Sequence, residues 1–122
     1  MTTRKKLNPA IMAQFTGSET FYRYGLAGDI LFTEGVKYVA DIAGAYWLLD
    51  IICIANVYEP KVRAEEFQLW VLCVGDNATS IVTCDDGNGN IVYEQVLNFT
   101  DFPEPGIRLY FCNGTILLPS EY

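Results

Sequence analysis

The carboxyl group of Asp50 is the first candidate for chemistry in this sequence, because it lies inside the apolar run "IAGAYWLLDIICIANV". A charge in such a run needs a partner, and a carboxyl group whose pKa is raised by burial is a usable acid, base or ligand anchor. Lys37, Arg23 or a tyrosine hydroxyl could be the partner. The alternative, which we favour, is a structural aspartate that is hydrogen-bonded in the core or lies at an exposed edge of a helix.

A second candidate is "DDGNGN" at residues 85–90, where oxygen-bearing side chains alternate from Asp86 as they do in a calcium loop. Such a loop has a turn glycine where this chain has Ile91, and a bidentate glutamate where it has Leu97. The flanking residues alternate like strands, and Asp, Asn and Gly are common in hairpin loops. The sequence therefore predicts a hairpin here, and we expect no metal site and no cofactor.

Aromatic side chains gather around the same candidates. Tyr46 and Trp47 precede Asp50, and Phe21, Tyr22 and Tyr24 surround Arg23. They could stack on a base or an aromatic ligand, although such residues more often pack in a core. The candidate binding residues are therefore Asp50, Lys37, Tyr46, Trp47 and Arg23, and no catalytic residue is assigned.

The composition excludes several classes of mechanism. The chain has no histidine, which removes Ser-His-Asp and Cys-His catalysis and leaves only carboxylate, tyrosine, lysine or cysteine chemistry. The net charge is −7, although Arg4, Lys5 and Lys6 make the start basic. An acidic body repels phosphate backbones, so direct nucleic-acid binding is not expected. The acidity serves solubility, or it mimics nucleic acid or attracts a basic partner.

The sequence also indicates where the protein works. No signal-peptide pattern is present, and the most apolar run, residues 42–57, is shorter than a membrane span and contains Asp50. We expect a cytoplasmic protein that does not enter a membrane. Its four cysteines are then reduced and act as small buried apolar residues. Met12 is a possible alternative start to Met1.

Two helices are expected to position Asp50 and its neighbours. In "TEGVKYVADIAG", Thr33 is a good N-cap, the apolar residues recur at helical spacing, and Gly44 is a natural end. The next segment, residues 45–57, is apolar on most sides, which is typical of a buried helix. Residues 58–66 read as a connection.

Strands follow the helices. The alternation of residues predicts strands over residues 67–74, 79–84, 90–99, 107–112 and 115–118, with "TFYRYG" and "LAGDILFT" as short strands or loops near the start. This order predicts an α+β fold, with N-terminal helices packed on one face of a four- or five-stranded antiparallel sheet, a meander. Residues 1–18 are expected to form a flexible arm and residues 19–122 a single domain. Trp70, Phe67 and the second face of the strand at residues 67–74 still need a cover, which a dimer partner or the N-terminal segment could supply.

Several stretches resemble one family. "LFTEGVKYVADIAGAYWLLDII", "MAQFTGSETFYRYG", "EFQLWVL", "TCDDGNGN", "TDFP" and "LLPSEY" are similar to an uncharacterised bacterial family, also found in phages and mobile elements, that is catalogued as a domain of unknown function. The resemblance covers residues 12–122. It implies an intracellular bacterial or phage setting and transfers no catalytic residue.

Three hypotheses about function follow. The leading one is a small acidic accessory protein that acts by binding another macromolecule, most readily a protein, with a homodimer also possible. The second is a small-molecule-binding domain or carboxylate-dependent enzyme, in which Asp50, a tyrosine and a basic residue converge in one pocket. The third is a subunit whose role is oligomeric structure alone.

Overall fold

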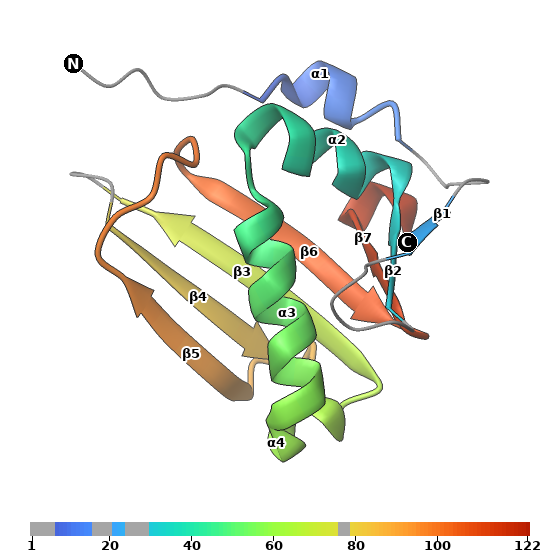
Figure 1. Ribbon diagram of the computed structural model, residues 1–122, viewed down its shortest axis with the longest axis vertical. Helices are drawn as coiled ribbons and strands as arrows, with labels where there is room; N and C mark the ends of the chain where they lie inside the picture. The colour runs from blue at the N-terminus through green and yellow to red at the C-terminus, as the bar shows by residue number, and fades with distance from the viewer. Residues whose placement is uncertain (1–6, 16–20, 24–29, 76–78) are drawn as a thin grey trace.

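The computed structural model describes residues 7–15, 21–23, 30–75 and 79–122 as an α+β fold (Figure 1). Its helices are α1 (Pro9–Met12), α2 (Glu34–Ala43), α3 (Tyr46–Tyr58), α4 (Pro60–Arg63) and a closing 3₁₀ turn, η2 (Pro119–Glu121). Its strands are β1 (Phe21–Arg23), β2 (Leu31–Thr33), β3 (Phe67–Val74), β4 (Ser80–Asp85), β5 (Ile91–Leu97), β6 (Gly106–Cys112) and β7 (Thr115–Leu117). The predicted α+β class is confirmed, but the two long helices, α2 and α3, lie between strands and not before them.

Helix α2 has the predicted boundaries. The Thr33 side chain accepts a hydrogen bond from the backbone N–H of Val36, and Gly44 ends the helix in the left-handed conformation with φ 63°. The buried side of α2 includes Val36, Val39 and Ala43, which recur at the spacing of one helix face. The other side carries Lys37 and Asp41 together with exposed Ile42, so α2 is an amphipathic helix at the surface of the core.

Helix α3 crosses one face of the sheet, as Figure 1 shows. Five of its residues are buried, and they include Leu49, Ile52 and Cys53. It is apolar on most sides, as expected, yet Ile54 and Tyr58 are exposed. The connection predicted after it contains the short helix α4, which Pro60 begins because proline needs no N–H partner in a first turn.

The sheet has seven strands in the order β1-β2-β7-β6-β3-β4-β5, and it corrects the predicted meander of four or five. Strand β6 does not follow β5 along the edge. It returns to the far side of β3, so β3 is central, and β7 then pairs with β6. β2 pairs with β7 in parallel, while every other pairing is antiparallel. The two short strands before α2 therefore complete the sheet.

The stretch "DDGNGN" forms the β4–β5 hairpin, as predicted. Asp86 Oδ1 accepts hydrogen bonds from the backbone N–H groups of Asn88 and Asn90, and its Oδ2 accepts one from Asn90 Nδ2 at 2.8 Å. Asp85 Oδ1 accepts one from Gly87 N–H. The carboxylates thus hold their own loop, and the described residues contain no group of three acidic, cysteine or histidine side chains placed to hold a metal ion.

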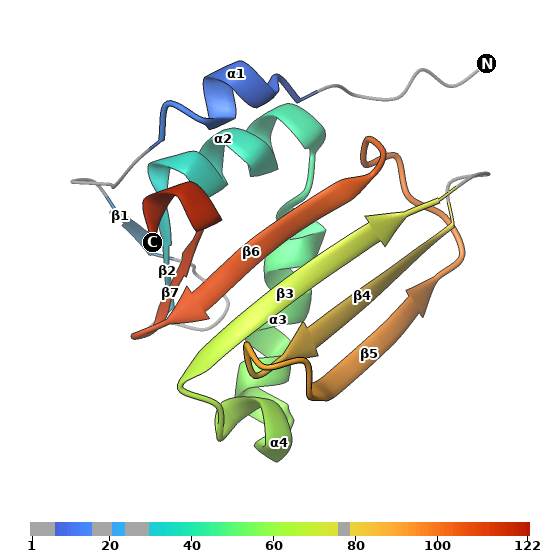
Figure 2. The same ribbon diagram turned by 180° about the vertical axis from the view of Figure 1, so that it is seen from behind.

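The two faces of the sheet differ in cover. Along β3, the buried residues beneath the helices are Gln68, Trp70, Leu72 and Val74, whereas Cys73 on the other face is exposed. Trp70 therefore already has a cover, contrary to the prediction, because it shares the face that the helices pack on. Seen from behind, no helix of the described chain crosses strands β6, β3, β4 and β5 (Figure 2). At one corner of this face Tyr122 packs against Phe67 and Tyr110, with ring centroids 5.5 and 5.3 Å away.

A buried amide joins α3 to the sheet. Gln68 is fully buried on β3, and its Nε2 donates to Asn56 Oδ1 at 2.8 Å and to the carbonyl oxygen of Val62 at 2.8 Å. Its Oε1 accepts hydrogen bonds from Asn56 Nδ2 and from Trp70 Nε1. This amide satisfies polar groups of α3, α4 and β3 at once, which the core requires of any buried polar atom.

Three other expectations can be compared with the structure. Of the predicted arm, only residues 7–15 are among those described, and they contain α1, with Phe15 packed 5.7 Å from the ring of Tyr38. All four cysteines are free thiols; Cys53 and Cys84 are buried, but Cys73 is exposed and Cys112 is half-buried. None of the helices in the described part of the chain has both the length and the apolar character of a membrane span.

Candidate functional site

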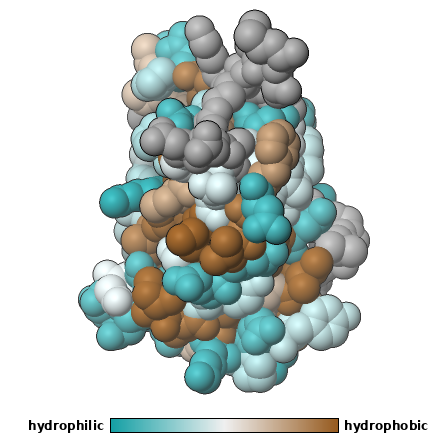
Figure 3. Space-filling model, turned by 90° about the vertical axis from the view of Figure 1, so that its left-hand side faces the viewer, coloured by the Kyte–Doolittle hydropathy of each residue, from teal (hydrophilic) through white to brown (hydrophobic). Residues whose placement is uncertain are grey.

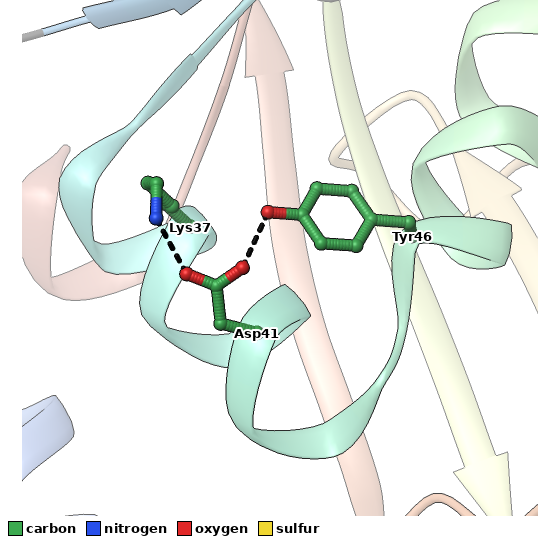
Figure 4. A network of polar contacts seen from close by, with 3 residues as sticks. All are labelled: Lys37, Asp41 and Tyr46. Atoms are coloured by element: carbon green, nitrogen blue, oxygen red, sulfur yellow. Dashed lines mark hydrogen bonds and ion pairs between the residues drawn. The ribbon is translucent and has the colours of Figure 1, made fainter.

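A polar network on α2 unites two of the predicted site residues (Figure 4). Lys37 Nζ lies 2.6 Å from Asp41 Oδ2, one helical turn away, and Tyr46 Oη donates a hydrogen bond to Asp41 Oδ1 at 2.5 Å. The helix places Lys37 and Asp41 on one side because residues four apart are neighbours. Tyr46 reaches the same carboxylate because the chain turns at Gly44 and starts α3 beside the end of α2.

Aromatic rings surround this network. The Lys37 ammonium lies 5.5 Å from the ring centroid of Tyr22, within the range of a cation–π contact. Tyr22 stacks on Phe32 at 5.5 Å, and Phe32 meets the edge of Tyr46 at 6.4 Å. Strands β1 and β2 supply the two rings, so the cluster joins the first sheet edge to both long helices.

The electrostatics of the network oppose acid–base chemistry. The hydrogen bonds from Lys37 and from Tyr46 lower the pKa of Asp41, so the carboxyl stays ionised. The hydrogen bond to Asp41 raises the pKa of Lys37, whose ammonium keeps its proton, and the hydrogen bond to Asp41 also raises the pKa of Tyr46. A general acid or base needs a pKa near the working pH, and each of these pKa values is shifted away from neutrality.

Among the described residues, Asp50 does not join Lys37 and Tyr46 in one network. Asp50 is half-buried on α3 and lines none of the hollows described below, whereas Asp41 takes the place between Lys37 and Tyr46. Trp47 lies on another side of α3 from Tyr46, and exposed Arg23 lies on the edge strand β1. The sequence identified the lysine and the tyrosine of the network but missed its carboxylate, although the spacing of Lys37 and Asp41 was visible.

A second candidate surface lies on the side of α3 that faces β5. Trp47, Leu97 and Phe99 line a hollow of about 310 Å³ together with Thr100 and Asp101. The stripe of α3 that begins at Trp47 continues along the helix at helical spacing. We call the whole set the α3–β5 surface: Trp47, Ile51, Ile54 and Tyr58 of α3, with Leu97 and Phe99 of the sheet side.

The α3–β5 surface borders the free edge of the sheet. Strand order ends at β5, so no described strand pairs with its outer edge. Apolar side chains are exposed along this edge: Ile91 is 54% exposed, Val96, which lies on the face away from α3, 64%, and Phe99 67%. Figure 3 views the molecule from the side on which β5 lies in Figure 1, and apolar side chains form patches across its middle and lower part. Strand alternation predicted the strand but not its place at the edge.

A third feature connects the C-terminal 3₁₀ turn to the start of α2. Glu121 accepts hydrogen bonds from Thr33 Oγ1 and from the backbone N–H of Gly35, at the start of α2. It also accepts one from the backbone N–H of Leu118. The stretches "TEG" and "LLPSEY" of the sequence therefore meet at one carboxylate, which joins the end of the chain to the start of α2.

The comparisons with known proteins agree with this fold. The crystal structure of a protein of unknown function from Enterococcus faecalis superposes with a TM-score of 0.54 and 20% sequence identity, covering 86% of this chain and 93% of that one. At this identity the likeness concerns the fold. No curated protein matches this chain. A family of unknown function, DUF6876, matches residues 6–122. The chain therefore belongs to the DUF6876 family.

Proposed function

We propose that this domain acts by binding another protein, and that an extended segment of that protein adds to the free edge of β5. The observation that carries the proposal is the position of β5 at the end of the sheet with apolar side chains exposed along it. An edge strand offers a row of backbone N–H and C=O groups to a further strand. Recognition by strand addition uses these groups for affinity and side-chain pockets for specificity.

The α3–β5 surface would supply the specificity. Side chains of an added strand alternate between the two faces, so those on the helix side would meet α3. There Trp47 and Phe99 border the hollow of about 310 Å³, which has room for one apolar or aromatic side chain. Natural proteins protect edge strands with charges, prolines or bulges. Strand β5 has a single charged residue, Glu94, and no proline, and its one irregularity is a register shift at Val92 near its start.

The charges favour a basic partner. The net charge of the chain is −7, and the charged residue that lines the hollow is Asp101. Complementary charge raises association rates and selects among partners. A segment with alternating apolar residues and at least one lysine or arginine is the chemistry that fits. Such a role in a cytoplasmic accessory protein agrees with the leading hypothesis from the sequence.

The alternative of an enzyme or small-molecule site receives less support. The three ionisable groups that do converge, Lys37, Asp41 and Tyr46, have their pKa values shifted away from neutral pH. Asp50 and the hollow at Trp47 do not meet. We therefore propose binding by the α3–β5 surface in preference to catalysis.

Site-specific photo-crosslinking in the producing bacterium tests the proposal. A photoreactive phenylalanine analogue replaces Phe99 on the α3–β5 surface in one variant and Phe21 on β1 in the control. Both residues are exposed phenylalanines, at 67% and 49%, near opposite edges of the sheet. We expect a discrete protein adduct from position 99 that is absent from position 21. Equal adducts at both positions, or none at position 99, would contradict the proposal.

A further inference from the structure

The uncovered face of the sheet carries a row of side chains with opposite charges at its two ends. Glu94 of β5 pairs in register with Thr83 of β4, Thr83 with Val71 of β3, and Val71 with Arg108 of β6. Residues that are directly opposite in a sheet share a face, and Val71 alternates with the buried residues of β3. The row therefore reads Glu94–Thr83–Val71–Arg108 across four strands.

The two charges cannot neutralise each other within one chain. They are three strand spacings apart, roughly 14 Å, which exceeds the reach of an ion pair. Glu94 and Arg108 are both exposed, and neither has an ion-pair partner among the described residues. A surface that presents both signs in one line can be complementary to itself.

A second copy fits this row in one orientation. A two-fold axis parallel to the strands, midway between β3 and β4, lays the row onto a copy of itself in reverse order. Arg108 of each copy then faces Glu94 of the other, and Val71 faces Thr83. A two-fold axis across the strands would instead set Arg108 against Arg108 and Glu94 against Glu94, which like-charge repulsion disfavours.

The neighbouring row fits the same orientation by shape. It runs Val96–Ile81–Cys73–Gly106, again in register across the four strands. Val96 is 64% exposed, whereas Gly106 has no side chain and lies in a hollow of about 340 Å³. The same axis places Val96 of one copy over Gly106 of the other. A projecting side chain thus meets a recess, while Ile81 covers Cys73.

Gly106 cannot fill its own recess. Its φ is +114°, and a Cβ atom there would lie 1.8 Å from the carbonyl oxygen of Leu72. The recess is therefore a fixed feature of the β3–β6 pair, open to a side chain from outside. It borders Arg108, so the shape match and the charge match belong to one surface.

We infer that two copies of this chain pack face to face through strands β3–β6, with Glu94 and Arg108 forming reciprocal ion pairs. Sheets that pack in this way lie about 10 Å apart, a distance that these two side chains span together. The face of four strands is roughly 19 Å wide. That is small for a specific interface, so the dimer should form reversibly at micromolar or higher concentration. The outer edge of β5 stays free in this dimer.

Sedimentation velocity over a range of about 1 µM to 1 mM tests the inference, a range that spans weak specific association. We expect the wild-type chain to dimerise with rising concentration. Glu94→Arg and Arg108→Glu each place like charges together and should weaken dimerisation by at least about tenfold. The double variant restores opposite charges with the order reversed, and its dimerisation should return to near the wild-type value.

Matched controls carry the same charge changes elsewhere. Glu59→Arg and Lys61→Glu alter exposed residues at the start of α4, away from the uncovered face, and should leave dimerisation unchanged. Circular dichroism checks that each variant is folded. A wild-type chain that remains monomeric at the highest concentration overturns the inference. So do single exchanges that leave dimerisation unaltered, controls that weaken it equally, or a double variant no better than the singles.

Discussion

The carboxylate of Glu121 accepts a hydrogen bond from Thr33 Oγ1 at 2.6 Å, although 88 residues separate the two in the sequence. Thr33 caps α2, and Glu121 brings a negative charge to the same helix N-terminus. The first backbone N–H groups of a helix have no partner within the helix, so a carboxylate there is favourable. The end of the chain thus completes the start of its first long helix.

Removing this contact should lower stability. We expect Glu121→Ala to cost about 2 kcal/mol, since hydrogen bonds to a charged group are lost in a partly buried site. Thr33→Ala should cost about 1 kcal/mol through the cap. Urea unfolding of the two single variants and the double variant gives the coupling. Costs that simply add would show that the two residues act independently, contrary to the structure.

The buried amide of Gln68 should matter more. Gln68→Leu leaves the Trp70 indole N–H and the Asn56 amide without their partner inside the core, so we expect a loss of about 3 kcal/mol. Gln95→Leu is the control, because it removes the same group from the edge strand β5, where Gln95 is half-buried. Urea unfolding compares the two. Equal costs would indicate that the Gln68 network contributes nothing beyond one ordinary hydrogen bond.

The pH dependence of the Lys37–Asp41–Tyr46 network follows from its pKa shifts. Because the pKa of Asp41 is lowered, its contribution to stability is present above its ordinary pKa of 3.8 and is lost as the pH falls through the lowered value. Because the pKa values of Lys37 and Tyr46 are raised, their contributions persist below their ordinary values and are lost as the pH rises through the raised ones.

Asp41→Asn should therefore lower the pKa of Tyr46 toward its ordinary 10.0. Ultraviolet titration of tyrosinate measures this change, and Tyr46→Phe identifies which part of the curve belongs to Tyr46. The midpoint of urea unfolding should change little, since the groups are exposed and such ion pairs contribute weakly. An unchanged titration curve in Asp41→Asn would mean that the hydrogen bond to Tyr46 does not persist in solution.

The four thiols should separate by reactivity. Burial, with smaller contributions from Asp50 and Asp85 respectively, raises the pKa of Cys53 and of Cys84 to about 12, so neither is a thiolate near neutral pH. At low protein concentration, where the proposed dimer does not cover Cys73, a thiol reagent should modify this exposed thiol first and Cys112 more slowly. In denaturant all four should react. Rapid reaction of four thiols in the native protein would contradict the packing of α3 and β4.

Local patterns predicted the elements whose signals are local. Thr33 and Gly44 predicted the ends of α2. The residues from Asp86 onward do not match a calcium loop and predicted a hairpin instead, because caps and turns depend on neighbouring residues. Strand β2 has three residues, and it joins the main sheet through a parallel pairing with β7, which lies far along the chain. No short-range pattern encodes such a pairing, so the sheet was predicted too small.

The candidate site shows the same division. Lys37 and Tyr46 were visible as residue types, but their shared carboxylate depends on how α2 and α3 meet after Gly44. The need for glycine at position 35 could not be predicted either. A Cβ atom there would lie 2.7 Å from Leu118 Cδ1, and Leu118 comes close to Gly35 only in the folded chain. The edge position of β5 follows from the return of β6 to β3, which alternation along each strand cannot specify.

Hydrogen–deuterium exchange on β5 tests the central claim, strand addition to the free edge, most directly. The partner captured at Phe99 is purified, and backbone amide exchange of this protein is compared with and without it. We expect the amides of residues 91–97 to gain protection on binding, since outward-facing N–H groups would enter a new ladder. The amides of α2 should not change. Protection elsewhere, with exchange in β5 unaltered, would contradict strand addition.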